Sequence, residues 1–395
     1  MKQLVIKYID FFCSKAQQFK SKSLVMCCLA LSFACEDFVE VDPPQSEISG
    51  EIIFTEPGTV NAALSAIYTQ VKDNVLLTGS LSGTSYLLGL YADELDYFSG
   101  PGTAPQFFYN NSIIPSDGAS SAIWNGAYNV IYNSNSIIEG VNNSTTLSEA
   151  DKNQFKGEAL FLRACIHFYM VNLFGDIPYI TSTDYQLNTT VSRTPSEEIY
   201  SLLISDLAEA KVLLSDAYVS GERIRANKGA AIALLARVYL YMQDWEKAEE
   251  ESTAVISNSG QYLLENDLNN VFLKESTSAI LQLKPTNEDD PSHEGQVFIF
   301  VSGPPANVAL TNQVINAFEP GDARRTNWVG TVTNGTESWY HAFKYKQQNN
   351  LGGGGNSTEY SVVLRLAEQY LIRAEARAQQ GDITGAQEDL NVIRT

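Results

Sequence analysis

The stretch SVVLRLAEQYLIRAEARAQQGDITGAQEDLNVIR, residues 361–394, decides the fold class. Small and apolar residues recur in it at spacings of three and four, which places them on one face of a helix: Leu364, Ala367, Leu371, Ala374 and Ala378. Gly381 and Asp382 interrupt the pattern, and a second apolar face follows, formed by Ile383, Ala386, Leu390 and Ile393. The stretch therefore predicts an antiparallel helix pair of the tetratricopeptide type, with helices at 361–380 and 383–394.

The same spacing occurs earlier, in residues 225–256, RANKGAAIALLARVYLYMQDWEKAEEESTAVI. Ala236 lies eight residues before Asp244, and Ala248 lies four residues after it. Residues 374, 382 and 386 repeat this arrangement of Ala, Asp and Ala. Two copies at matched spacing favour a repeat scaffold. The alternative is two unrelated helical hairpins whose contact seams are rich in alanine.

Helical periodicity elsewhere extends this pattern to eight helices in four pairs: 57–73 with 120–141, 148–174 with 196–215, 226–243 with 245–258, and 361–380 with 383–394. Thr146 with Glu149, and Thr194 with Glu197, have the spacing of capping boxes at two helix starts. Residues 76–118 and 259–360 lack helical periodicity, and strands are expected at 279–284 and 296–301. The predicted fold is mainly α: a TPR-like scaffold of four helix pairs with irregular, short-β insertion lobes.

Composition limits the classes of function. The chain has 395 residues, of which 44% are hydrophobic, so a sizeable core is available. Its net charge of −20 repels phosphate backbones and argues against nucleic acid as a partner. Cys165 and His167 lie in a nearly all-apolar helix and are expected in the core. No metal-ligand spacing is present, so no metal or cofactor is predicted.

Residues 1–34 have the pattern of an export signal. Five Lys residues precede an apolar run at 24–34 that is too short to span a bilayer. Cys35 follows directly, which resembles a bacterial lipobox and predicts lipid modification of that residue. The alternative is an ordinary signal peptide with an incidental cysteine. The acidic, proline-containing residues 35–50 are expected to form a tether before a domain at 51–395.

Both insertion lobes combine aromatic side chains with short polar ones. Sugar rings have apolar faces rimmed by hydroxyl groups, so flat side chains stack on the faces while polar side chains bond the rims. The residues expected to bind such a ligand are Asp96, Tyr97, Phe98, Trp328, Trp339 and Tyr340. The alternative for each ring is a place in the core of its lobe.

Asp93, Glu94 and Asp96 form an acidic group in the first lobe. A glycosidase needs two carboxylates on opposite sides of one bond, usually from separate elements. Three acids within four residues do not have that arrangement, so no catalytic residue is predicted. A solvated surface and a calcium site are the two other interpretations.

Several landmarks, in order, resemble the SusD/RagB family of outer-membrane nutrient-binding lipoproteins of Bacteroidetes. They are Cys35–Phe38 with VDPP at 41–44, GEALFLRA at 157–164 with LFGDIPY at 173–179, NKGA at 227–230 with LLARVYLY at 234–241, AFEPGDARR at 317–325, and LRLAEQYLIRAEA at 364–376. Their joint occurrence in this order covers nearly the whole chain after the export signal, which makes the resemblance specific.

The resemblance implies four TPR units that support a variable ligand-binding lobe. It implies a lipid-anchored protein on the outer surface of the outer membrane, which captures oligosaccharide or peptide for a SusC-like TonB-dependent transporter. Such proteins bind ligands and are not enzymes. The family usually continues beyond residue 394, so the resemblance also implies a C-terminal truncation. Two alternatives remain: a TPR scaffold that binds only proteins, and, less favoured, a secreted glycosidase.

Overall fold

The computed structural model describes residues 53–74, 77, 79–350 and 355–394, which belong to one compact unit, Ile53–Thr395. The expected export signal at 1–34, Cys35 and the expected tether at 35–50 lie outside the described residues.

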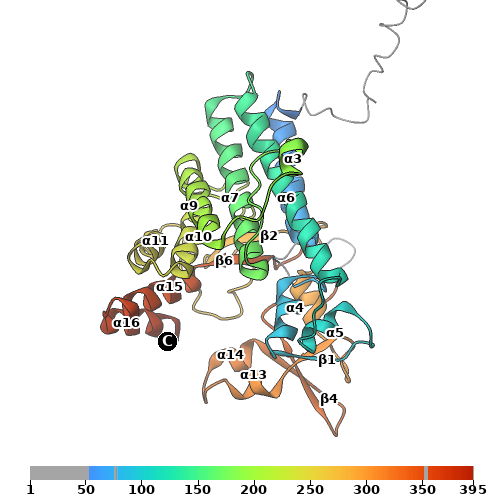
Figure 1. Ribbon diagram of the computed structural model, residues 1–395. Coiled ribbons are helices and arrows are strands. Elements are labelled where there is room, and N and C mark those ends of the chain that lie inside the picture. The colour runs from blue at the N-terminus through green and yellow to red at the C-terminus, as the bar shows by residue number, and fades with distance from the viewer. Residues whose placement is uncertain (1–52, 75–76, 78, 351–354, 395) are drawn as a thin grey trace, which may run out of the picture. The chain divides into compact units, whose positions relative to one another are not determined.

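Four helix pairs form the scaffold, and they are the pairs that the periodicity predicts (Figure 1). They are α3 (Pro57–Asn74) with α6 (Gly118–Asn143), α7 (Glu149–Phe174) with α9 (Ser196–Leu213), α10 (Lys228–Tyr241) with α11 (Trp245–Ser257), and α15 (Leu366–Gln379) with α16 (Ile383–Arg394). Helix α6 also packs on α7, α9 on α10, and α11 on α15, so each pair rests on the next. This nearest-neighbour stacking is typical of a helical repeat protein.

The matched Ala–Asp–Ala spacing has a physical cause. All four alanines are buried at the seams between helices, because a larger side chain would hold the helices apart. The Asp244 carboxylate accepts a hydrogen bond from the Lys247 amide at 3.3 Å, and Asp382 accepts one from the Gly385 amide at 2.9 Å. Each aspartate thus caps the first turn of the second helix in its pair.

Buried charges join the first helix pairs. Glu158 on α7 is fully buried, and its Oε1 accepts a hydrogen bond from Arg225 Nη2 at 2.7 Å. The Tyr68 hydroxyl on α3 donates to Glu158 Oε2 at 3.0 Å. Further along α7, Arg163 donates two hydrogen bonds to Asp206 on α9 at 2.8 and 2.7 Å. Each of these four buried charges therefore has a partner of opposite sign, which offsets the cost of its desolvation.

Cys165 and His167 are both in the core, as predicted. His167 Nε2 accepts a hydrogen bond from the Ile180 amide at 3.3 Å, so Nδ1 carries the proton and donates to the Arg163 carbonyl at 2.9 Å. Burial lowers the pKa of His167 to about 3 and raises the pKa of Cys165 to about 12. Both groups are therefore neutral at physiological pH.

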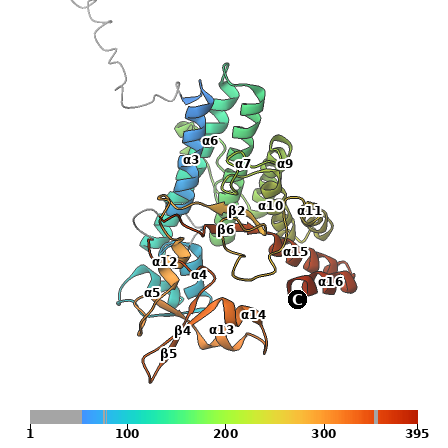
Figure 2. The ribbon, with the colours of Figure 1, turned by 180° about the vertical axis from the view of Figure 1, so that it is seen from behind.

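The two insertion segments contain short elements. Residues 76–118 hold α4 (Thr84–Tyr91), β1 (Leu95–Tyr97) and α5 (Ala104–Tyr109), and a single-turn helix α8 (Tyr185–Asn188) lies between α7 and α9. Residues 259–360 hold β2 (Ala279–Leu283), α12 (His293–Phe298), β3 (Val308–Leu310), α13 (Asn312–Asn316), α14 (Ala323–Asn327), β4 (Val329–Thr333) and β5 (Ser338–Ala342). Strand β6 (Ser361–Arg365) pairs with β2, and the two lie side by side next to the scaffold helices (Figure 2).

Two predicted elements are wrong. The strand expected at 296–301 is absent, because Ser292 Oγ accepts a hydrogen bond from the Gly295 amide and starts helix α12 there. The helix expected from residue 361 begins only at Leu366, since residues 361–365 form β6 along the fully buried strand β2. The first predicted strand, at 279–284, is confirmed as β2.

The structure also differs from the prediction at two helix starts and in the buried face of the last helix pair. Ser148, not Thr146, caps α7. Helix α9 starts at Ser196 without a side-chain cap, because Pro195, whose side chain has no acceptor, occupies its N-cap position. In the last pair Leu371, Ile383 and Leu390 are exposed, although the periodicity placed them on the contact faces. The buried positions are mostly small residues: Ala374 and Ala386, which the periodicity placed correctly, and Ala376 and Gly385, which it did not include.

Candidate functional site

The two insertion lobes combine in one sheet. Strands β1, β3, β5 and β4, in that order, form an antiparallel sheet, here called the lobe sheet. Strand β1 comes from the first lobe, and the other three come from the second. The sheet thus brings Asp96 and Tyr97 near Trp339 and Tyr340, although the two pairs are far apart in the sequence.

The pairing register divides these residues between two faces. Residues that directly oppose each other in antiparallel strands point to the same face. Tyr97 opposes Val308, and Tyr340 opposes Leu310, two positions along the same strand. Tyr97 and Tyr340 therefore share one face, whereas Asp96 and Trp339 point to the other. A ligand on one flat face cannot contact all four.

In the first lobe, Phe98 is the most available predicted ring. The Tyr97 hydroxyl donates to the Gly100 carbonyl at 2.8 Å, and its ring lies 6.0 Å from the Tyr109 ring. Asp96 is half-buried, and desolvation raises its pKa. Phe98 directly follows β1 and keeps 38% of its surface exposed. Tyr97 is thus tied into the lobe, while Phe98 can contact a ligand.

In the second lobe, Trp339 and Tyr340 on β5 are half-buried. The Trp339 ring lies against Gly303, where a Cβ atom would come within 2.1 Å of it, so only glycine fits there. The Arg325 guanidinium lies over the Tyr340 ring, 5.2 Å from its centroid. Both rings are held in place by these neighbours and keep part of their surface available.

Trp328, predicted to bind ligand, also packs inside the second lobe. Its Nε1 donates to the Leu268 carbonyl at 2.9 Å, and its ring meets the Phe272 ring edge-on at a centroid distance of 5.4 Å. It packs on a small core cluster of Val271, Phe272 and Tyr345. The ring remains half-buried, so one part supports the lobe and the other part faces out.

The acidic group at Asp93, Glu94 and Asp96 is spread over a turn and a strand. Asp93 has a positive φ of 58° and is exposed together with Glu94, whereas Asp96 lies in β1. Within the described residues no group of three or more His, Cys, Asp or Glu side chains gathers where a metal ion could be held.

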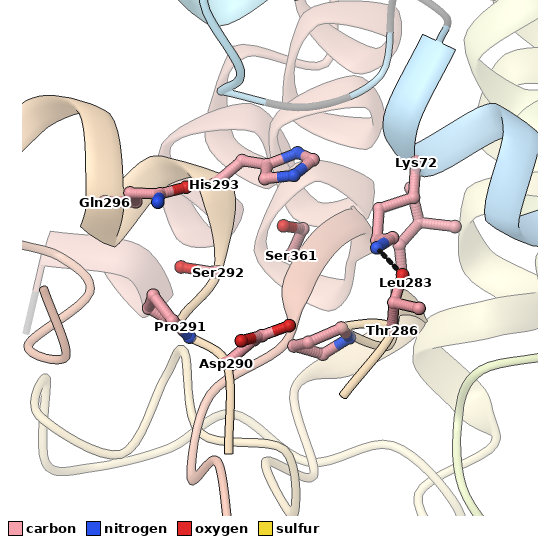
Figure 3. Close-up of a pocket in the computed structure, with 10 residues that line it drawn as sticks. Lys72, Leu283, Thr286, Asp290, Pro291, Ser292, His293, Gln296 and Ser361 are labelled. Atoms are coloured by element: carbon pink, nitrogen blue, oxygen red, sulfur yellow. Dashed lines mark hydrogen bonds between the residues drawn. The ribbon is translucent and has the colours of Figure 1, made fainter. Parts of the chain in front are cut away.

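A separate, polar pocket lies where the end of α3 meets β2, α12 and the start of β6 (Figure 3). Its volume of about 140 Å³ is below that of a pocket for a drug-sized ligand and holds about four or five waters. Lys72 Nζ pairs with Asp73 at 2.8 Å and donates to Thr286 Oγ1 at 2.6 Å, and Ser361 donates to Glu294 at 2.6 Å.

None of the six predicted ligand residues lines this pocket, whose walls are Lys72, Leu283, Pro285, Thr286, Asp290, Pro291, Ser292, His293, Gln296 and Ser361. Its size and its internally bonded side chains make it a poor site for an oligosaccharide. The lobe sheet is therefore the better candidate. Sequence reasoning did not identify this pocket, because its residues come from four elements and from the connection between β2 and α12, and share no motif.

Two protein-family models match this chain. A SusD-like model, described as starch-binding associating with outer membrane, matches residues 90–240. A SusD family model matches residues 238–395. The two matches adjoin, so together they extend from the first lobe to the last helix pair.

Curated relatives are also SusD-like. The chain is 30% identical over 250 residues to SusD-like protein P25 of Formosa agariphila, covering 59% of this chain and 45% of that protein. It is 29% identical over 262 residues to a SusD-like protein of Bacteroides ovatus, covering 62% of this chain and 46% of that protein. The chain thus spans about half the length of these relatives.

Solved structures share the fold. A SusD superfamily protein from Bacteroides thetaiotaomicron superposes with a TM-score of 0.71 at 24% identity, covering 86% of this chain and 80% of that one. A laminarin-binding SusD-like protein superposes with a TM-score of 0.71 at 21% identity, covering 85% of this chain and 83% of that one. At these identities the likeness concerns the architecture.

Proposed function

Because the chain belongs to the SusD/RagB family, we propose that it is a lipoprotein of the outer cell surface that binds oligosaccharide. In this proposal it delivers the oligosaccharide to a SusC-like TonB-dependent transporter in the outer membrane. A laminarin-binding protein among the structures with the same fold supports carbohydrate as the class of ligand.

The observation that carries the proposal is the exposed aromatic surface of the lobes. Phe98, Trp339 and Tyr340 are each partly exposed and lie outside the main core cluster, which the scaffold helices and the lobes share. A partly exposed ring beside polar groups suits the apolar face of a sugar. The helix pairs are the rigid frame, and the lobe sheet presents these rings.

Binding, rather than catalysis, is the proposed activity. The acids of the first lobe lie on one turn and one strand, whereas glycoside hydrolysis needs two carboxylates that face each other across the bond. A nutrient peptide is the second candidate ligand, since rings and polar groups also suit peptide side chains. A scaffold that binds only proteins is the alternative that the internal packing of Tyr97 and Trp328 favours.

Isothermal titration calorimetry against a panel of oligosaccharides tests the binding proposal. We expect saturable binding to at least one oligosaccharide, and a roughly tenfold weaker affinity in Trp339→Ala, because a stacked ring contributes about 1 kcal/mol beyond its buried area. Trp245→Ala, which removes a half-buried tryptophan of the scaffold, is the matched control. Absence of binding to every oligosaccharide, with retained binding to the transporter, would favour the scaffold alternative.

Membrane attachment is proposed through lipid modification of Cys35. None of the helices in the described part of the chain is long and apolar enough to cross a bilayer. Mass spectrometry of the protein from its native membrane would detect the acyl chains on Cys35, and Cys35→Ser should release the protein from the membrane fraction. A membrane-bound Cys35→Ser variant would refute this anchor.

A further inference from the structure

The positive charges of this acidic chain are distributed unevenly. Residues 323–365 contain five Lys and Arg residues against two Glu residues, although the whole chain has a net charge of −20. One of the two acids, Glu359, is buried and accepts hydrogen bonds from the amides of Lys346 and Gln347. Residues 323–365, which include the last part of the second lobe and strand β6, are thus a locally basic stretch.

Lys344 and Arg365 differ from most cations of the scaffold. Arg163, Arg225 and Arg237 each pair with a carboxylate at 2.7 Å or less. In the described residues neither Lys344 nor Arg365 has a carboxylate within ion-pair distance, and no hydrogen bond of either side chain is found. Both lie over the Phe272 ring instead, 5.5 and 5.4 Å from its centroid.

The surroundings of these two cations are suited to a third, negative group. Arg365 is also 5.9 Å from the centroid of the Trp328 ring, which is half-buried. Desolvation by the surrounding protein lowers the pKa of Lys344, although its side chain keeps access to solvent, and the Arg365 charge lowers it further. Desolvation likewise lowers the pKa of Arg365. A bound anion would offset both effects.

Three carboxylates lie within electrostatic range, and two of them are engaged elsewhere. Glu294 accepts hydrogen bonds from the Gly79 amide at 2.9 Å and from Ser361 at 2.6 Å. Glu368 accepts two hydrogen bonds from Arg237, at 2.5 and 2.7 Å. Glu94 is exposed and does not reach Lys344 within ion-pair distance. The two cations therefore remain available to an external ligand.

We propose that Lys344 and Arg365, beside the Trp328 ring, form a subsite for the acidic group of an anionic oligosaccharide. The shared chemistry is a sugar that carries a uronate carboxylate or a sulfate ester. Its ring can lie on the partly exposed tryptophan while the anion meets the ammonium and the guanidinium, whose fork fits a planar carboxylate or sulfate oxygens. This inference rests on the proposed function and names the substrate class of the same lobe.

Titration calorimetry of the whole protein with three probes tests the inference: an oligogalacturonate, a sulfated carrageenan oligosaccharide and a neutral cello-oligosaccharide of similar length. We expect one of the two acidic probes to bind at least about tenfold more tightly than the neutral one, because a hydrogen bond to a charged group contributes about 1.5–3 kcal/mol. Which acidic probe binds distinguishes carboxylate from sulfate.

Substitutions then locate the subsite. Lys344→Gln should lower the affinity for the acidic probe about tenfold and leave the affinity for the neutral probe unchanged. Arg365→Gln should do the same, and Arg365→Lys should restore part of the affinity. Lys247→Gln is the matched control, because Lys247 also lies over a ring, that of Tyr239, at 5.1 Å but on the scaffold. Lys344 is exposed, so its variant tests the proposal even where the Arg365 variants unfold.

The outcomes separate this inference from the proposed function. Tighter binding of the neutral probe, or acidic binding that survives Lys344→Gln, overturns the anionic subsite and leaves oligosaccharide binding intact. If none of the three probes and no oligosaccharide of the wider panel binds, both the anionic subsite and the proposed oligosaccharide binding are overturned. A decline in acidic-probe affinity with rising salt, absent for the neutral probe, supports the subsite.

Discussion

Charged and aromatic side chains have different surroundings in the helical scaffold and in the region of the insertion lobes. In the scaffold, buried arginines such as Arg163 and Arg225 pair with carboxylates. In the two lobes and the adjoining strand β6, Lys344 and Arg365 lie over aromatic rings without an acid partner, and Phe98, Trp339 and Tyr340 keep part of their surface exposed. Internally satisfied groups stabilise a fold, whereas partly satisfied groups can accept a ligand. Stability and binding should therefore respond to different substitutions.

The largest expected effect is on the buried charges of the scaffold. Glu158→Gln leaves the Arg225 charge buried without its partner, so the free energy of unfolding should fall by about 3–5 kcal/mol. Chemical denaturation measures this loss. The matched control is Glu209→Gln on α9. It breaks a more exposed ion pair with Lys156, which lies on α7 as Glu158 does, and should lower the free energy of unfolding by at most about 1 kcal/mol. Equal losses in the two variants would contradict this distinction.

A second prediction concerns acid pH and the scaffold core. The folded pKa of His167 is about 3, below its unfolded value, so the unfolded chain binds a proton at this residue that the folded chain excludes. The stabilisation is present above the unfolded pKa, near 6.5, and is lost as pH falls toward 3, by up to about 1.4 kcal/mol per pH unit.

Denaturation curves between pH 7 and pH 4 measure this dependence. Because burial also lowers the pKa of His293 and His341, the comparison is with the variants His167→Gln, His293→Gln and His341→Gln. The slope should flatten most in His167→Gln. An unchanged slope in that variant would show that His167 does not carry the effect.

A third prediction concerns the lobe alone. Trp339→Ala should reduce ligand affinity about tenfold while leaving the unfolding of the scaffold nearly unchanged, since this ring packs on Gly303 and not on the main core. Calorimetry and thermal unfolding on the same sample measure both quantities. A large loss of Tm with no loss of affinity would assign Trp339 to the structure of the lobe.

The smallest expected effect is at the helix caps that explain the repeat spacing. Asp382→Ala and Asp244→Ala each remove one acceptor from the first turn of a helix and should each lower the free energy of unfolding by about 1 kcal/mol. Denaturation measures both. Ligand affinity should be the same in both variants as in the native protein, and a change in affinity would place the caps in contact with the site.

The scaffold could be predicted from sequence because its signals are local. Helical periodicity and the Asp244 and Asp382 spacing arise within single hairpins, so they give the four pairs nearly at their observed bounds. Two elements were predicted wrongly because their structure is not decided by local signals. Residues 361–365 read as helix and residues 296–301 as strand, because both are short apolar runs whose structure depends on the neighbouring β2 and on the Ser292 cap.

The lobe sheet could not be predicted, because β1 pairs with β3 across a long stretch of intervening chain. The six ligand residues were chosen by residue type and by lying in loops. Whether a ring faces solvent depends on tertiary packing, and for this reason Tyr97 and Trp328 prove to be partly internal. The basic pair at Lys344 and Arg365 has no sequence signal apart from the local excess of positive charge.

Hydrogen–deuterium exchange with and without a saturating oligosaccharide tests most directly whether the lobe sheet is the binding surface. We expect the ligand to slow exchange at the end of β1, which Phe98 directly follows, and at β5, where Trp339 lies, and to leave exchange in the scaffold helices unchanged. Protection confined to the scaffold helices, or to the pocket around Lys72 and Asp290, would contradict this assignment.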